Sequence, residues 1–121
     1  MRPKEVVLDW VEVFNKADAE ALAEFYAEDA VNYQVPKEPV RGKAAIAEMF
    51  REEFAQAEMV CILENIFEDG EWAIIEWKGP GTDTMRGCGF FHIVNDKIAF
   101  QRGYWDKLTF LRLNGMPIPT E

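Results

Sequence analysis

The spacing of hydrophobic residues changes along the chain, from helical in the first half to strand-like in the second. It predicts three helices, over about residues 3–14, 18–26 and 42–54. Pro3 suits a first helical turn, and Asp18 fits the N-cap of the second helix. The apolar side of the third helix consists of Ile46, Met49, Phe50 and Phe54.

Between the second and third helices, a short strand over residues 31–34 places alternate side chains on opposite sides. Val31 and Tyr33 share one side, and Asn32 and Gln34 share the other. Four longer strands are predicted over residues 59–67, 71–78, 85–94 and 97–110. The tail beyond them, interrupted by prolines, is expected to lie on the surface or against a partner subunit.

Helices that precede a meandering antiparallel sheet indicate an α+β fold with the helices on one face. Asp69-Gly70 and Asn95-Asp96 are typical of the tight turns of such a meander. A chain of 121 residues can build one core, so we expect a single domain over residues 1–121.

Composition narrows the possible partners and compartment. The formal net charge of -9 argues against nucleic acid and anionic membranes as partners. The N-terminal segment lacks the apolar run of a signal peptide, which favours a cytoplasmic protein. Cys61 and Cys88 form no CxxC motif and are expected to be buried free thiols rather than a disulfide or zinc ligands. Nothing in the chain calls for a metal or an organic cofactor.

Two runs, "YAEDAV…P…RGKAAI" from Tyr26 and "DKIAFQRGYWD" from Asp96, resemble the cone-shaped fold of nuclear transport factor 2. Small enzymes with this fold include SnoaL-like polyketide cyclases, ketosteroid isomerases and limonene-epoxide hydrolases. The resemblance implies three N-terminal helices packed on a curved antiparallel sheet, with a conical pocket open at one end. It also implies a homodimer that forms through the outer face of the sheet.

The resemblance also identifies catalytic groups that this chain lacks. The ketosteroid isomerases use a tyrosine and two aspartates, which by alignment fall on Trp10, Gln34 and Gly89. The Arg-x-Asp pair of the limonene-epoxide hydrolases is reversed in Glu76-Trp77-Lys78, and Gly103 stands where their further aspartate falls. Neither established mechanism is therefore complete here.

Glu76 and Lys78 are the predicted catalytic pair, because they stand two apart on a predicted strand that is otherwise apolar. If both face the pocket, Glu76 acts as acid and base while Lys78 stabilises developing negative charge. In the other interpretation both face water, while Ile75 and Trp77 face the core. The alignment favours the first interpretation.

The remaining candidates are predicted to bind a ligand. Asn32 and Gln34 fall where the resemblance places polar pocket groups, although an edge strand that shows polar side chains to water has the same pattern. The aromatic residues expected to line the cone are Trp10, Phe50, Phe54 and Trp105. An apolar stripe of this kind can equally be ordinary core. His92, the single histidine, alternates with Phe90 and Val94 and is expected to point away from the cone.

Two functions remain open. The first is an enzyme that performs isomerase, cyclase or hydrolase chemistry on a small apolar organic molecule. The second is a non-catalytic ligand-binding or dimerisation module of the same fold. The missing aspartates favour the second, and an inward Glu76–Lys78 pair would favour the first.

Overall fold

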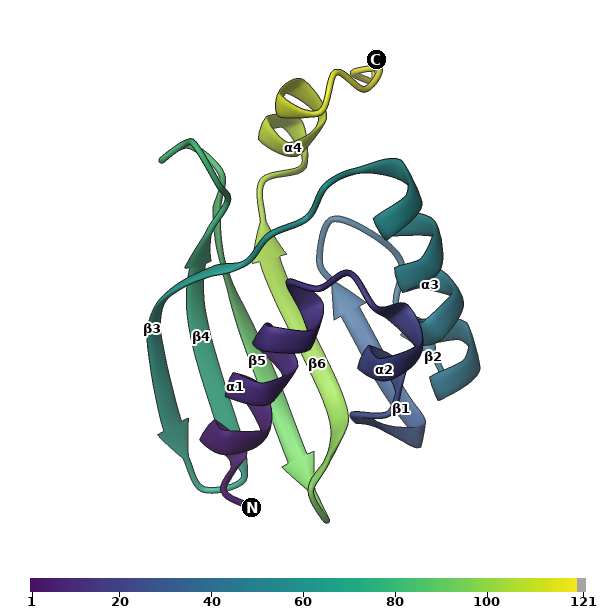
Figure 1. The fold of residues 1–121 in the computed structure, drawn as a ribbon, viewed down its shortest axis with the longest axis vertical. Coiled ribbons are helices and arrows are strands. Elements are labelled where there is room, and N and C mark those ends of the chain that lie inside the picture. Colours follow the sequence, from purple (N-terminus) through teal and green to yellow (C-terminus); the bar gives the residue numbers. More distant parts are fainter. Residues whose placement is uncertain (120–121) are drawn as a thin grey trace.

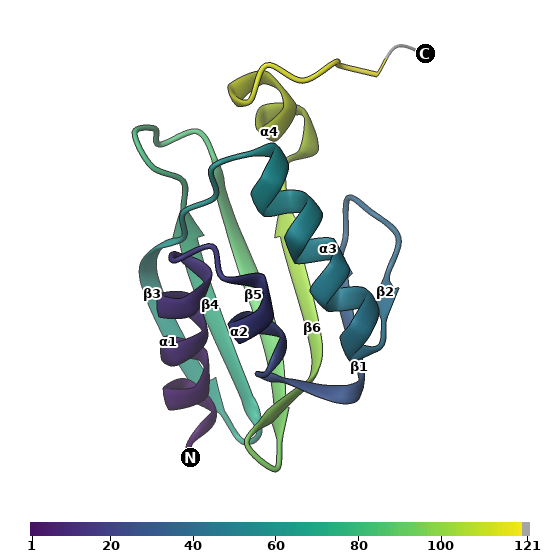
Figure 2. The same ribbon diagram turned by 45° about the vertical axis from the view of Figure 1, so that its right-hand side comes forward.

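The computed structural model describes residues 1–119 as a layer of helices against one face of a sheet, with the C-terminal helix beyond the end of the sheet (Figures 1 and 2). The elements in chain order are α1 (Pro3–Phe14), α2 (Ala19–Ala23), β1 (Tyr26–Gln34), β2 (Val40–Arg41), α3 (Lys43–Gln56), β3 (Ile62–Asp69), β4 (Trp72–Lys78), β5 (Arg86–Val94), β6 (Lys97–Trp105) and α4 (Lys107–Leu113). The predicted α+β class and the three N-terminal helices are confirmed.

The sheet has six strands in the order β2-β1-β6-β5-β4-β3. β3 to β6 form an antiparallel meander, whereas β1 runs parallel to β6, with Asn32 opposite Gln101 and Gln34 opposite Gly103. The prediction of a purely antiparallel sheet is therefore wrong at this one junction. A parallel pair needs a long crossover connection, which α3 and the meander supply here.

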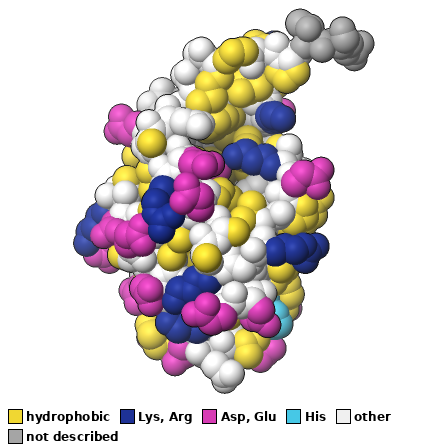
Figure 3. All heavy atoms as spheres, turned by 90° about the vertical axis from the view of Figure 1, so that its right-hand side faces the viewer, with side chains coloured by type: hydrophobic (Ala, Val, Ile, Leu, Met, Phe, Trp, Pro, Cys, Tyr) yellow, Lys and Arg dark blue, Asp and Glu magenta, His cyan; other side chains and the backbone are white. Residues whose placement is uncertain are grey.

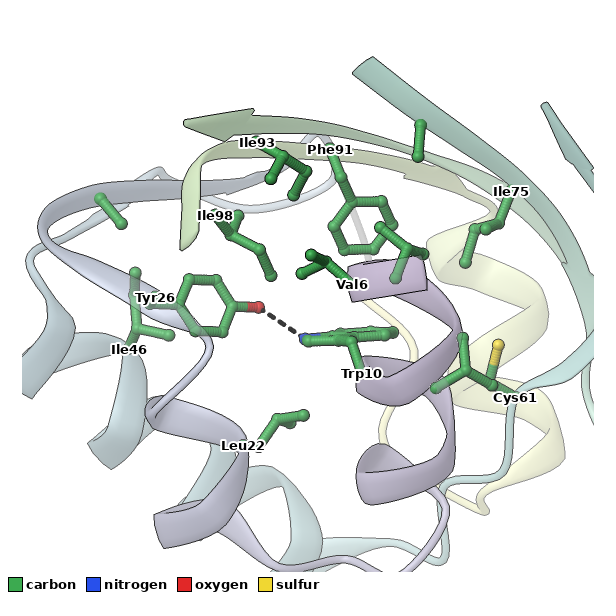
Figure 4. Packing of buried hydrophobic residues seen from close by; sticks show 14 of the residues in the cluster. Val6, Trp10, Leu22, Tyr26, Ile46, Cys61, Ile75, Phe91, Ile93 and Ile98 are labelled. Carbon is green, nitrogen blue, oxygen red and sulfur yellow. Dashed lines mark hydrogen bonds between the residues drawn. The ribbon is translucent and has the colours of Figure 1, made fainter. Parts of the chain in front are cut away.

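The core forms where α1 crosses the inner face of the sheet (Figure 4). Trp10 packs edge-on against Phe91 of β5, with ring centroids 5.0 Å apart. The indole nitrogen of Trp10 also donates a hydrogen bond of 3.1 Å to the hydroxyl of Tyr26. Both rings are almost completely buried. This contact joins the helical layer to β1.

Several predicted boundaries are wrong, and the strand predicted over residues 31–34 begins at Tyr26. The second helix ends at Ala23 rather than Tyr26, because Tyr26 begins β1 and pairs with Ile98 of β6. The strand predicted over residues 59–67 is β3, which begins at Ile62 and ends at Asp69, since residues 59–61 form no strand. The last strand ends at Trp105, because the Asp106 side chain accepts a hydrogen bond from the Thr109 backbone nitrogen and caps α4.

The turns follow their sequence signals. Asn95 and Asp96 both have positive φ angles, of 52° and 63°, as a tight hairpin between antiparallel strands requires. Gly70 adopts a φ of 59° at the preceding hairpin, where Asp69 pairs with Trp72. Short turns therefore set the register of β3 with β4 and of β5 with β6.

We expect Phe91→Ala to lower the free energy of unfolding by about 3–5 kcal/mol, because it removes a fully buried ring between α1 and the sheet. Urea denaturation measures the change. Leu8→Ala, at a residue of α1 that is 41% exposed, serves as control and should cost less than about 1 kcal/mol. Similar losses for the two variants would contradict this position of the core.

Candidate functional site

A cavity of about 320 Å³ lies between the helices and the inner face of the sheet, and it opens toward α4. This volume suits a small organic molecule. Figure 3 shows hydrophobic surface gathered toward α4 on this side of the molecule, with acidic and basic side chains around it. The walls are largely aromatic and aliphatic, and they include Trp10, Phe50, Ile75, Trp77, Phe91 and Trp105.

Four side chains form a hydrogen-bonded network at the inner end of the cavity. The Tyr26 hydroxyl accepts from Trp10 and donates to Oε1 of Gln101. The same oxygen accepts a 3.1 Å hydrogen bond from Nδ2 of Asn32. Asn32 and Gln101 are 1% and 5% exposed, so β1 and β6 each place a buried amide here.

Gln34 extends this network toward the mouth of the cavity. Its Nε2 donates to Oδ1 of Asn32 over 2.7 Å, and its Oε1 accepts from the indole nitrogen of Trp105 over 2.9 Å. The side chain crosses the face of Gly103, where a Cβ atom would lie 2.1 Å from Gln34 Oε1. Only glycine at position 103 leaves room for this arrangement.

The network is neutral, and it retains donors for a ligand. Burial raises the pKa of Tyr26 far above its ordinary value, so its hydroxyl keeps its proton. Nε2 of Gln101 has no hydrogen-bond partner within residues 1–119, and Nε2 of Gln34 uses one of its two hydrogens. An oxygen atom of a ligand can accept from these amides.

A single ion pair lies in the cavity lining among the described residues. Nζ of Lys37, in the loop after β1, is 2.8 Å from Oε1 of Glu53 on α3. The Glu53 side chain is only 17% exposed, and the Lys37 ammonium lies 5.7 Å from the ring centroid of Trp105. The pair therefore links the β1–β2 loop to α3.

Glu76 and Lys78 lie on the outer face of the sheet, so the prediction that they face the pocket is wrong. The inner positions of β4 belong to Ala73, Ile75 and Trp77. Lys78 pairs with an acidic residue of the following loop, and Glu76 is exposed. The opposite orientation would bury two charged side chains in an apolar cavity, which is costly.

Five of the six residues predicted to bind a ligand line the cavity, namely Trp10, Asn32, Gln34, Phe50 and Trp105. Their contact with a ligand stays a prediction.

Phe54 does not line this cavity. It packs against Phe14 and Phe50, with ring centroids 5.4 and 5.7 Å apart, near the end of α3. The predicted role of Phe54 as a wall of the cone is therefore wrong. His92 points outward as expected, where it stacks on Trp72 and lies 3.0 Å from Glu71.

Sequence reasoning missed Gln101, Tyr26, Lys37 and Glu53. Gln101 alternates with Gly103 and Trp105 along the last strand, and this period of two was a usable signal for Gln101. Tyr26 was missed because the predicted second helix, which extends too far, includes it. The Lys37–Glu53 pair joins segments 16 positions apart, and no local pattern marks it.

Comparison with known proteins identifies the family. Residues 7–101 match the SnoaL-like domain, which is most of the chain. The protein belongs to the SnoaL-like domain family. A search of functionally curated proteins found no match to this SnoaL-like domain.

Solved structures similar to this SnoaL-like domain share its fold at low sequence identity. A Catenulispora acidiphila protein with a ketosteroid isomerase-like fold is 17% identical, with a TM-score of 0.80 and coverage of 97% of this chain and 96% of that one. A putative polyketide cyclase from Sinorhizobium meliloti is 22% identical (TM-score 0.72, coverage 82% and 93%). A limonene-epoxide hydrolase-like enzyme from M. tuberculosis is 19% identical (TM-score 0.74, coverage 86% and 82%). These likenesses establish the fold of the SnoaL-like domain.

Three further features concern the described residues 1–119. No group of three or more His, Cys, Asp or Glu side chains there is placed to hold a metal ion. Cys61 and Cys88 are both free thiols, and Cys61 is buried as expected while Cys88 is half-buried. None of the helices described is long and apolar enough to cross a membrane.

We expect this SnoaL-like domain to lose stability as the pH rises above about 9, because burial raises the pKa of the Cys61 thiol from 9.0 to about 12. The unfolded chain then releases a proton that the folded chain keeps. The contribution of this thiol to the free energy of unfolding has its full value below pH 9 and is lost between pH 9 and 12. Urea denaturation at pH 8 to 11 measures the slope.

Cys61→Ala should reduce this slope by up to about 1.4 kcal/mol per pH unit. Cys88→Ala, which removes a less buried thiol, should change the slope less. Parallel curves for wild type and Cys61→Ala would contradict the assignment.

Proposed function

We propose that this SnoaL-like domain binds a small, largely apolar organic molecule that carries a carbonyl or similar acceptor oxygen. The observation that carries this proposal is the neutral amide network in an aromatic cavity, in which Asn32 and Gln101 are buried at the inner end and Gln34 extends toward the mouth. An apolar cavity with a few convergent polar groups is the usual form of a ligand site.

The polar groups select the chemistry of the ligand. Oε1 of Gln101 already accepts from Tyr26 and Asn32, so the free capacity of this amide lies in its Nε2 hydrogens. Donors without partners favour an acceptor on the ligand, and burial penalises a ligand that leaves them unpaired. The walls supply hydrophobic contact for the rest of the molecule.

Known proteins of this fold give independent support. The Catenulispora acidiphila protein was solved in complex with trimethylamine. The M. tuberculosis neighbour is an epoxide hydrolase-like protein, and the Sinorhizobium meliloti neighbour is a putative polyketide cyclase. Small organic molecules are thus the class of ligand that the fold accommodates.

We also propose that the domain forms a homodimer through the outer face of its sheet. That face is rich in apolar side chains, namely Ile62, Phe67, Trp72, Ile74, Phe90, Val94, Phe100 and Tyr104. Phe67 and Tyr104 are 59% and 43% exposed, which is unusual for large apolar groups that gather on one surface. A sheet with two apolar faces requires a cover on both.

We expect Gln101→Glu to weaken binding of a cyclic ketone about tenfold or more, since it replaces the donating amide by an acceptor and keeps the oxygen that Tyr26 and Asn32 need. The assay is thermal shift and calorimetry with cyclic ketones and the hydrocarbons of the same skeleton. Wild type should prefer the ketone, and the variant should lose this preference.

Gln56→Glu is the matched control, because it makes the same change at an exposed position of α3. It should bind as the wild type does. Equal affinity of wild type for ketone and hydrocarbon would reject the role of the amides, and absence of binding by either probe class would reject this ligand class.

A second function, acid–base catalysis in the same cavity, is favoured by one observation. Glu53 is a little-exposed carboxylate in the lining, held in place by Lys37. Fixed carboxylates transfer protons in many enzymes.

If Glu53 transfers protons, Glu53→Gln should lower turnover about 10²–10⁴-fold and leave binding within a few-fold of wild type. The substrate for this assay is the molecule that native mass spectrometry finds bound to the purified protein. Glu58→Gln, at another carboxylate of the lining, is the control. Unchanged turnover in Glu53→Gln would reject this role.

A further inference from the structure

The outer face of the sheet carries several charged side chains, and most of the cations have a carboxylate partner within the chain. Lys78 lies 3.2 Å from Asp83, and His92 lies 3.0 Å from Glu71. Arg86 pairs with Glu64 of β3. These groups are satisfied without a second molecule.

Arg102 differs from these cations. Its guanidinium lies 5.5 Å from the ring centroids of Phe90 and Phe100 and 5.9 Å from that of Tyr104. Its Nε is buried and has no hydrogen-bond partner within residues 1–119, and no carboxylate there comes within 4.0 Å of the side chain. Aromatic faces attract a cation but do not replace the oxygen acceptor that a buried N–H group requires.

Glu76 lacks a cation, just as Arg102 lacks a carboxylate. Its Oε1 accepts a 2.7 Å hydrogen bond from the neutral amide of Asn65, and within residues 1–119 no cation lies within 4.0 Å of its carboxylate. Carboxylate and guanidinium form the strongest common side-chain pair, through two parallel hydrogen bonds. At the centre of this face, Glu76 therefore lacks a cation and Arg102 lacks an oxygen acceptor.

The strand register fixes where these two groups lie. Arg102 of β6 is opposite Phe90 of β5, and Glu76 of β4 is opposite Cys88 of β5. Gly89 thus marks the midpoint between them. From ordinary strand spacings their backbones are about 12 Å apart, on opposite sides of that midpoint.

A two-fold axis that runs between two packed sheets exchanges positions on either side of it. Here the axis would lie between the two sheets, pass over Gly89 and run perpendicular to the line from Arg102 to Glu76. It would then bring Arg102 of each copy against Glu76 of the other copy. Both unpaired groups then become paired at once, and the apolar side chains around them become covered. Lys78, Arg86 and His92 already have carboxylate partners within the chain.

We propose that two copies of this chain pair through reciprocal Arg102–Glu76 ion pairs across the outer faces of their sheets. This inference rests on the proposed homodimer and names the contacts that set its symmetry. The aromatic rings around Arg102 exclude water from the pair, and this strengthens it. It also gives Glu76 a role in place of the catalytic one.

The test is a charge exchange at the two positions, followed by native mass spectrometry and sedimentation equilibrium. Wild type should be a dimer at micromolar concentration. Arg102→Glu and Glu76→Arg should each raise the dimer dissociation constant about tenfold or more, because each places like charges together. The double variant should return to within about threefold of wild type, since it restores both pairs in reverse.

Arg51→Glu is the matched control, because it makes the same change of charge on α3, where Arg51 pairs with Glu20 and Glu48. It should leave the dimer unchanged. Circular dichroism and the ketone-binding assay check that each variant keeps its fold and cavity. If Arg102→Glu does not fold, Glu76→Arg at the exposed position still decides whether the pair exists.

The outcomes separate the two proposals. A monomeric wild type would overturn both the dimer and the ion pairs. A dimer that Glu76→Arg leaves intact, or that the double variant fails to restore, would overturn the ion pairs alone. Ligand binding is measured separately for every variant, so the test of the proposed cavity function is independent of the test of the dimer.

Discussion

The hydroxyl group of Tyr26 holds the helical layer and the sheet in one arrangement. It accepts a hydrogen bond from Trp10 of α1 and donates one to Gln101 of β6. All three side chains are buried, so a shift of α1 along the sheet, or of β1 against β6, would leave polar groups unpaired at considerable cost. The cavity, its neutral amides and the parallel β1–β6 pair all depend on this network.

This constraint explains how polar and charged groups are distributed. Inside the cone, buried positions on β1 and β6 carry amides, because amides can satisfy one another without a net charge. On β4 and β6, the charged side chains of Glu76, Lys78 and Arg102 lie on the outer face. In the cavity lining, the Lys37–Glu53 pair stands near the mouth, where solvent still reaches Lys37.

The comparisons fit a fold that is kept while its chemistry changes. Structures with 17% to 22% identity superpose over more than four fifths of the chain, and their names include different activities. Such a scaffold places side chains of β1 and β6 at the inner end of a cone, and a change of those side chains changes what the cone can do. Here those positions hold Asn32, Gln34 and Gln101.

Local patterns in the sequence determined much of the architecture. Apolar residues at helical spacing predicted α1 and α3, the Asn95-Asp96 dipeptide predicted its hairpin, and Asp18 predicted a helix start. Each depends on neighbours within a turn of chain, where backbone sterics and local hydrogen bonds act. The fold class follows from the order of these elements.

The orientation of β4 and the pairing of β1 were decided only by tertiary structure. Ile74 on one side and Ile75 on the other leave β4 without a clear polar face, so alternation could not assign Glu76 inward or outward. Asn32 meets Gln101 across 69 positions of chain, and Tyr26 joins them through a hydroxyl that no helical or strand period reveals. Packing of α1 against the sheet makes those contacts possible, and only the folded chain brings them together.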